Sequence, residues 1–302
     1  MIYKEISSNK WRSVLLIGVF VVLIMAVGYV FGEMLYPDYA LYILPAAIGF
    51  SLLTSFGSYY WSDSIVLAMN GARPASKHDF PYLVNTVEGL AIAAGLPMPK
   101  TYVVDDPSPN AFATGRDPEH AAICATTGLL DKVDRQELEG VLAHEMSHIK
   151  NYDIRLAMLA AVLAGTIVFM SHWMTRSLFW GGGGRRRSSS DSGGGQIQAI
   201  LMILGLVLMI LAPIFATMIQ LAISRKREYL ADASGAMLTR NPEGLADALL
   251  KISADPEPVQ RANGATAHLY IVNPFKGGGA LMANLFSTHP PTEERVRRLR
   301  AM

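Results

Sequence analysis

Long uncharged hydrophobic runs alternate along this chain with polar segments in which apolar residues recur at helical or strand spacing. The runs cover residues 13–32, 39–60, 156–175 and 196–224. A helix needs about 20 apolar residues to cross the hydrocarbon core of a bilayer, and each run reaches that length. The pattern therefore predicts four hydrophobic transmembrane helices separated by polar segments.

The polar segments predict a mainly α-helical domain with a small β-sheet, an α+β fold. Apolar residues at helical spacing predict a helix over residues 77–95 that stops at Gly95. Short β-branched or small apolar stretches predict strands at residues 101–104, 111–114 and 121–127. Asp134, with Glu137 three residues later and an apolar stripe behind it, predicts a capped helix.

The four runs divide the chain into successive segments with different surroundings. We expect a tail (1–12), two transmembrane helices (13–60), the first part of a soluble domain (61–155), a transmembrane hairpin (156–224) and the second part of that domain (225–302). The tail carries Lys4, Lys10 and Arg12, whereas the turn between the first two runs has no Lys or Arg. The positive-inside rule therefore places the tail and the soluble domain in the cytoplasm.

A low-complexity linker of Gly, Arg and Ser, residues 181–195, joins the second pair of runs. If both runs cross the membrane, its arginines lie on the outer face, where loop-charge counting does not favour them. The pair is either a transmembrane hairpin or a hairpin that enters the bilayer without crossing. Both alternatives return the chain to the cytoplasmic side.

The helix predicted after Asp134 contains the pattern His-Glu-x-x-His, formed by His144, Glu145 and His148. Residues four apart share a helix face, so both imidazoles can bind one metal ion. Glu145 lies close enough to deprotonate a water molecule at the metal without binding the metal itself. The motif predicts metal-assisted peptide hydrolysis, and the alternative is a chance pair of surface histidines.

The first residues after the fourth run predict a third ligand. Glu228 and Asp232 are four apart on a continuing helix, which the hairpin returns to the side of the histidines. Catalytic zinc takes three protein ligands, so we expect Glu228 to bind the metal and Asp232 to orient a histidine. The alternative is a charged helix at the membrane interface, which Arg225, Lys226 and Arg227 also fit.

A strand beside the metal helix would suit a peptidase, because an edge strand can pair with an extended peptide. The candidates for this edge are Asn110, Ala111 and Phe112, and the alternative is an ordinary internal hairpin with Asn110 in its turn.

Composition narrows the classes of function. Hydrophobic residues make up 51% of the chain and the formal net charge is +1, which does not fit a nucleic-acid-binding surface. A single cysteine excludes an intramolecular disulfide framework. The Gly-rich linker lacks the Gly-Lys-Ser/Thr ending of a phosphate loop, so we expect no nucleotide site.

The metal-motif helix, the hydrophobic pair after it and the following Glu-x-x-x-Asp together resemble the HtpX heat-shock family of membrane proteases. These are gluzincins related to the CAAX prenyl protease. The resemblance covers essentially the whole chain, and residues 109–115 and 287–295 are similar to family signatures. It implies one zinc ion per chain, bound by His144, His148 and Glu228, with Glu145 as the general base.

The resemblance also implies further site residues and a cellular role. Ala113 would join Asn110, Ala111 and Phe112 along the substrate edge, and His289 and Arg295 would lie near the active site, contacting substrate or transition state. From the residues alone, His289 equally fits a loop before a helix with Thr292 as its N-cap. The implied protein is a multi-pass endopeptidase of the bacterial cytoplasmic (inner) membrane, with its active site facing the cytoplasm. Its substrates would be misfolded or damaged membrane proteins and unfolded polypeptides, and self-association is left open.

The alternative function is a non-catalytic, zinc-binding membrane scaffold. Structural zinc prefers four protein ligands, and a scaffold would leave Glu145 without a task.

Overall fold

The computed structural model describes residues 2–35, 40–181, 225–262, 266–275 and 290–302, together with residues 203, 207, 210 and 211. The chain forms two compact units. The first contains Met1–Ser13, Tyr59–Met158 and Gln220–Met302, and the second contains Val14–Ser58 and Leu159–Ile219. His289, nearly all of the fourth hydrophobic run and most of the Gly/Arg/Ser linker lie outside the described residues.

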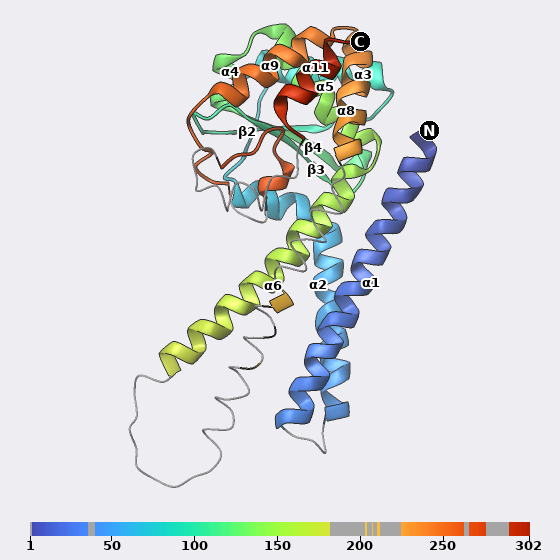
Figure 1. The fold of residues 1–302 in the computed structure, drawn as a ribbon, viewed down its shortest axis with the longest axis vertical. Helices are drawn as coiled ribbons and strands as arrows, with labels where there is room; N and C mark the ends of the chain where they lie inside the picture. Colours follow the sequence, from blue (N-terminus) through green and yellow to red (C-terminus); the bar gives the residue numbers. More distant parts are fainter. Residues whose placement is uncertain are drawn as a thin grey trace. The chain divides into compact units, whose positions relative to one another are not determined.

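Long helices make up the described part of the second unit (Figure 1). They belong to α1 (Ile2–Leu35), α2 (Ala40–Met69) and α6 (Asp153–Gly181). On α1 the buried apolar residues recur every four positions, as Leu16, Phe20 and Ile24. On α6 the same spacing buries Leu159, Leu163 and Ile167. Helices α1 and α6 thus each bury one apolar stripe, as the 3.6-residue period dictates.

The structure bears on the predicted number of transmembrane helices. Among the described residues, Ile6–Ala26 in α1 is by itself long and apolar enough to cross a membrane. The pair Arg135–Lys150 and Asp153–Phe169, bent by 82°, would count as a second only if it formed one span. The second and third predicted runs are helical in α2 and α6. The expected total of four is therefore not confirmed and stays a prediction.

A four-stranded mixed sheet belongs to the first unit, with strand order β1-β2-β4-β3. Its strands are β1 (Arg73–Pro74), β2 (Lys100–Val104), β3 (Ala111–Gly115) and β4 (Ala121–Thr126). β2 and β4 are parallel, whereas β1 pairs with β2 and β3 pairs with β4 in antiparallel fashion. The three predicted strands are confirmed, and β3 is an edge strand.

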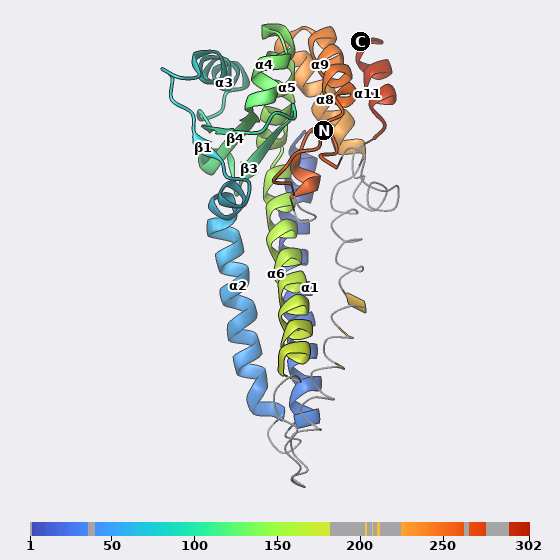
Figure 2. The ribbon, with the colours of Figure 1, turned by 90° about the vertical axis from the view of Figure 1, so that its left-hand side faces the viewer.

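Helix α5 (Arg135–Lys150) lies at the centre of the first unit and carries the metal motif. It begins at the predicted capping box: the Asp134 carboxylate accepts from the Glu137 amide at 2.9 Å, and the Glu137 carboxylate accepts from the Asp134 amide at 2.7 Å. One side of α5 packs against α3 (Pro81–Ala94) and β3, and the other side packs against α8 (Arg225–Thr239) and α9 (Pro242–Ala254) (Figure 2). The motif is therefore surrounded by structure on both sides.

The remaining helices of the first unit test where the predicted helices begin and end. α3 starts at Pro81, later than expected, and ends as predicted before Gly95, whose φ of 68° is the left-handed conformation that glycine tolerates. The short helix α4 (Thr127–Lys132) connects β4 to α5. In α11 (Thr292–Leu299) the expected N-cap is wrong, because Pro291 takes that position. The Thr292 hydroxyl hydrogen-bonds to Ser253 at 2.9 Å instead.

Helix α8 approaches the metal-motif helix closely at Gly235. A Cβ atom at this position would lie 3.0 Å from the His144 backbone nitrogen, so a side chain fits only if α8 moves away. Asp232 and Glu228 lie about one and two turns earlier on the same helix. The distance between α8 and α5 therefore determines how close Glu228 comes to the histidines.

We predict that Gly235→Ala destabilises the protein by about 1–3 kcal/mol, because the added methyl group overpacks a contact between two helix backbones. The matched control is Gly89→Ala in α3, where a Cβ atom meets nothing within 4 Å. That change should stabilise by up to about 1 kcal/mol through helix propensity. Chemical denaturation in detergent, followed by circular dichroism, measures both, and equal effects would contradict the close-approach argument.

Candidate active site

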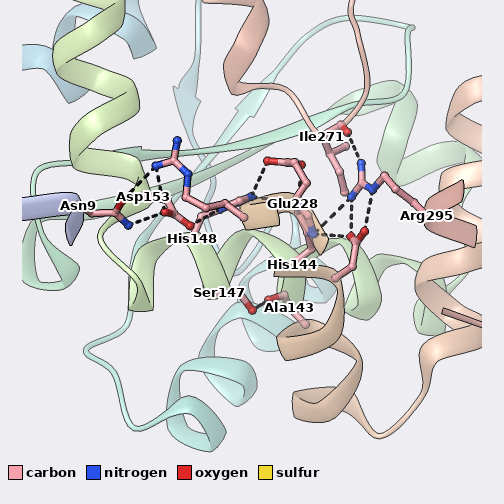
Figure 3. Close-up of polar contacts among 11 residues, drawn as sticks. Asn9, Ala143, His144, Ser147, His148, Asp153, Glu228, Ile271 and Arg295 are labelled. Carbon is pink, nitrogen blue, oxygen red and sulfur yellow. Dashed lines mark hydrogen bonds and ion pairs between the residues drawn. The ribbon is translucent and has the colours of Figure 1, made fainter. Parts of the chain in front are cut away.

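Three side chains from two helices converge on one point (Figure 3). His144 and His148 come from one face of α5, and Glu228 comes from α8. The two Nε2 atoms are 3.1 Å apart, and the Glu228 carboxylate oxygens lie 3.8 Å from His144 Nε2 and 3.6 Å from His148 Nε2. All three residues offer ligand atoms within 4.8 Å of one another.

This group fits a divalent metal ion. Bonds of about 2.0–2.1 Å to a tetrahedral metal place neighbouring ligand atoms about 3.3 Å apart, close to the separations observed here. Imidazole nitrogen and carboxylate oxygen are the donors that zinc takes in catalytic sites. Three protein ligands leave a further position for a water molecule or substrate, which a structural site with four protein ligands does not.

Each histidine is oriented by a carboxylate on its other ring nitrogen. His144 Nδ1 lies 2.9 Å from Asp232 Oδ1, which is the arrangement that the spacing predicted for Asp232. His148 Nδ1 lies 3.0 Å from Asp153 Oδ2, a contact that the sequence reasoning did not anticipate. A carboxylate accepts the Nδ1 proton and so turns the Nε2 lone pair toward the metal position.

Arg295 holds Asp232 in place through two of its three guanidinium nitrogens. Its Nε and Nη2 atoms donate to the two Asp232 oxygens at 2.9 and 2.7 Å, and Nη1 donates to the Ile271 carbonyl at 2.9 Å. The side chain is 1% exposed and is not among the residues that line the cavity at the metal position. These contacts favour a positioning role, whereas the predicted contact with substrate or transition state stays a prediction.

Residues 77–302 match the model of peptidase family M48. The chain belongs to peptidase family M48. A Dictyoglomus thermophilum relative described as "Protease HtpX homolog" is 51% identical over 99% of this chain and 94% of its own length. A Tropheryma whipplei relative of the same description is 46% identical over 100% of this chain and 99% of its own. The resemblance to the HtpX family is thus confirmed, and the chain is a metalloprotease.

A solved structure extends the likeness to the fold. The chain superimposes on the crystal structure of S. mikatae Ste24p with a TM-score of 0.50, over 98% of this chain and 67% of that one. The two sequences are 20% identical, so this likeness concerns the fold alone. In this chain the motif helix α5 and the helix α8, which carries Glu228, meet although they lie far apart in the sequence.

Glu145, the predicted general base, is 2% exposed and lines the same cavity as the three predicted ligands. Burial raises the pKa of its carboxyl to about 7, against the opposing charge of His148. The Ala113 backbone amide, on the edge strand β3, hydrogen-bonds to the carboxylate. A carboxyl group with a pKa near neutrality can both accept and return a proton at physiological pH.

The two histidines differ in their electrostatic surroundings. Burial lowers the pKa of His144 to about 4, although its hydrogen bond to Asp232 acts in the other direction. Burial opposes protonation of His148 as well, but Asp153 and the charge of Glu228 raise its pKa to about 9. His144 is therefore neutral at pH 7, the form that binds metal, whereas a metal at the site competes with a proton for His148.

The cavity at the metal position is small, about 40 Å³. That volume holds an ion and a few water molecules but not a peptide. Residues that line it include Ala113, Arg227, His268 and Ile271. Among the described residues, the cavity itself is therefore too small to hold a polypeptide.

The predicted substrate edge is paired with another segment of the chain itself. Tyr270 forms an antiparallel bridge with Phe112, and the Ile271 amide donates to the Ala111 carbonyl at 3.0 Å. The Asn110 side chain donates to the Val272 carbonyl at 2.9 Å. A role for Asn110, Ala111, Phe112 and Ala113 in binding substrate stays a prediction, and pairing on this edge would displace residues 270–272.

Sequence reasoning missed three residues beside the ligands: Asp153, Arg227 and His268. Asp153 is the first residue of α6, five positions after His148, and it was not predicted as a site residue. Arg227 is 6% exposed, although it also fitted the alternative prediction of a charged helix at the membrane interface. His268 lines the cavity and its Nε2 lies 3.2 Å from the Ala157 carbonyl. A search for carboxylates within about five residues of the motif's end would have found Asp153.

We predict that Asp232→Ala weakens metal binding about 10–100-fold, because His144 loses the group that orients it. The same change leaves the buried Arg295 charge unpaired and should destabilise the protein by about 3–5 kcal/mol. The double variant Asp232→Leu/Arg295→Met removes both charges and should regain stability without regaining metal affinity.

Chelator competition measures the affinity of these variants, and denaturation measures their stability. The control is Arg300→Met, which removes the exposed Arg300–Asp247 ion pair and should change neither quantity. If the double variant binds metal as tightly as the wild type, Asp232 does not orient His144.

Proposed function

We propose that this chain is a zinc-dependent endopeptidase of the bacterial cytoplasmic membrane. It hydrolyses misfolded or damaged membrane proteins and unfolded polypeptides at the cytoplasmic face. The observation that carries the proposal is the convergence of His144, His148 and Glu228 with the buried Glu145 in one cavity. Zinc is favoured over other divalent ions by two imidazoles and one carboxylate around a tetrahedral position.

The chemistry that zinc supplies at such a site is polarisation of the scissile carbonyl and activation of a water molecule. Glu145 accepts a proton from the attacking water, for which a pKa of about 7 suits it at neutral pH. The same carboxyl then returns the proton to the departing amine. The Ala113 amide, which hydrogen-bonds to Glu145, keeps the carboxylate beside the edge strand.

The edge strand supports an endopeptidase with loose side-chain selectivity. Main-chain pairing along β3 recognises an extended backbone without regard to side chains, as a protease of damaged proteins requires. Residues 270–272 now bond to that edge, so a substrate takes their place by exchanging one set of main-chain hydrogen bonds for another. Segments that are already unfolded can make this exchange, whereas folded chains cannot offer a free backbone.

Membrane location is supported by apolar side chains on the long helices. Val22 of α1, Leu53 of α2 and Phe169 of α6 are 65%, 75% and 71% exposed. Large apolar groups exposed over whole helices indicate a lipid environment. Lys10 and Arg12, at the N-terminal end of α1, support a cytoplasmic location for that end and for the catalytic part of the first unit.

We predict that Glu145→Gln keeps its zinc and loses about 10²–10⁴-fold of casein hydrolysis, because the amide cannot take the proton from water. The matched control is Glu139→Gln, on the same helix and outside the metal cavity, which should keep wild-type activity. A chelator should abolish wild-type turnover, and added zinc should restore it. Equal activity of the wild type and Glu145→Gln would remove Glu145 from the mechanism, and zinc without turnover would favour a scaffold.

We predict that both ends of the chain face the cytoplasm. In a Cys124→Ala background, Ser7→Cys and Met302→Cys should react with a membrane-impermeant maleimide only after the cells are opened. Glu33→Cys, in the turn predicted to lie outside, should react in intact cells. Labelling of Ser7→Cys or Met302→Cys in intact cells would contradict the proposed orientation.

A further inference from the structure

The N-terminal end of α1 reaches the metal centre through Asn9. This asparagine precedes the first hydrophobic run, in the polar tail of the chain, and is 0% exposed. Its Nδ2 donates to Asp153 Oδ1 at 2.7 Å and to the Asn151 carbonyl at 3.0 Å (Figure 3). Asp153 in turn accepts from His148 on its other oxygen at 3.0 Å. A chain of two hydrogen bonds therefore joins Asn9 to a metal ligand.

The segment that Asn9 contacts is the sharp turn between α5 and α6. Tyr152 in this turn has a φ of 60°, a backbone conformation that residues other than glycine rarely adopt. The neighbouring Lys10 places its ammonium group 4.4 Å from the centre of the Tyr152 ring. Asn9 and Lys10 together thus hold the turn that ends the motif helix and positions Asp153.

Arg227 completes the group from the other side. Its Nη1 donates to Asn9 Oδ1 at 3.2 Å and lies 3.4 Å from Asp153 Oδ1. Arg227 directly precedes Glu228, the third ligand, on α8. Asn9 therefore contacts both the carboxylate that orients His148 and the residue next to Glu228.

We propose that Asn9 is a positioning residue of the metal centre, so that the N-terminal end of α1 sets the orientation of His148 through Asp153. Two properties of the contacts carry this. Asn9 uses both of its polar atoms, donor and acceptor, on neighbours of the metal ligands. Its donation to Asp153 fixes which carboxylate oxygen remains for His148. The inference rests on the metal site of the proposed function and is independent of which substrate is cleaved.

The test uses the full-length protein in detergent and measures metal affinity by competition with a chromogenic chelator. Asp153→Ala should weaken zinc binding about 10–100-fold, as removal of a ligand's carboxylate partner does. Asn9→Ala should weaken it about fivefold to tenfold, because Asp153 remains but is no longer held. Asn9→Asp, which keeps the shape and places a second carboxylate against Asp153, should weaken it more than Asn9→Ala.

Two controls separate positioning from general stability. Asn241→Ala removes an asparagine that caps α9 through the Gly244 amide, and should lower stability without changing metal affinity. Ser7→Ala, two residues before Asn9 and exposed, should change neither. The visible absorption of the cobalt-substituted protein reports ligand geometry directly, and it should change in the Asn9 variants but not in the controls.

Zinc affinity and a cobalt spectrum equal to those of the wild type in Asn9→Asp, in protein whose circular dichroism shows it folded, would overturn the proposal. So would a loss of affinity in Asn241→Ala as large as in Asn9→Ala. These readouts do not require turnover. A protein whose metal affinity depends on Asn9 but which cleaves nothing would contradict the proposed function while leaving this inference intact.

Discussion

The close packing of α8 against α5 is the contact on which the rest of the site depends. Gly235 lets the two backbones meet, and one and two turns away that contact delivers Asp232 to His144 and Glu228 to both histidines. Neither helix could bind a metal alone, because α5 offers two ligands and α8 only one. The site is therefore a property of a helix interface, and a change that separates the helices moves Glu228 away from the histidines.

Burial of so many ionisable groups is tolerable because each has a specific partner. Asp232 is 3% exposed, yet the charge of Arg295 and the hydrogen bonds from His144 and Arg295 hold its pKa at about 2 despite burial. Glu145 is the exception, since burial raises its pKa to about 7 and, within the part of the chain that the structure describes, no ion pair includes it. A carboxyl left without an ionic partner is the one that can exchange a proton, so the same low-polarity environment stabilises the ligands and activates the base.

Local spacing predicted the parts of the site that lie within one helix or its immediate continuation. The capping box at Asp134, the pair His144 and His148, and the pair Glu228 and Asp232 all follow from residues three or four apart. Contacts between distant segments carry no such signal. Asn9 lies 144 residues from Asp153, and nothing in its neighbourhood marks it as different from any polar residue before a hydrophobic run. The pairing of residues 270–272 with β3 and the hydrogen bonds of Arg295 to Asp232 could not be predicted from the sequence for the same reason. Tertiary packing determines both contacts.

The two imidazoles show how widely the protein distributes control of one metal position. Each has a carboxylate on Nδ1, and each carboxylate contacts an arginine: Asp232 contacts Arg295 of α11, and Asp153 contacts Arg227 of α8. Asn9 adds the end of α1 to the second of these groups. The residues that orient the ligands thus come from segments that hydrophobic runs separate along the chain. A metal centre that needs all these segments together cannot be complete until the helices that carry them have packed against one another.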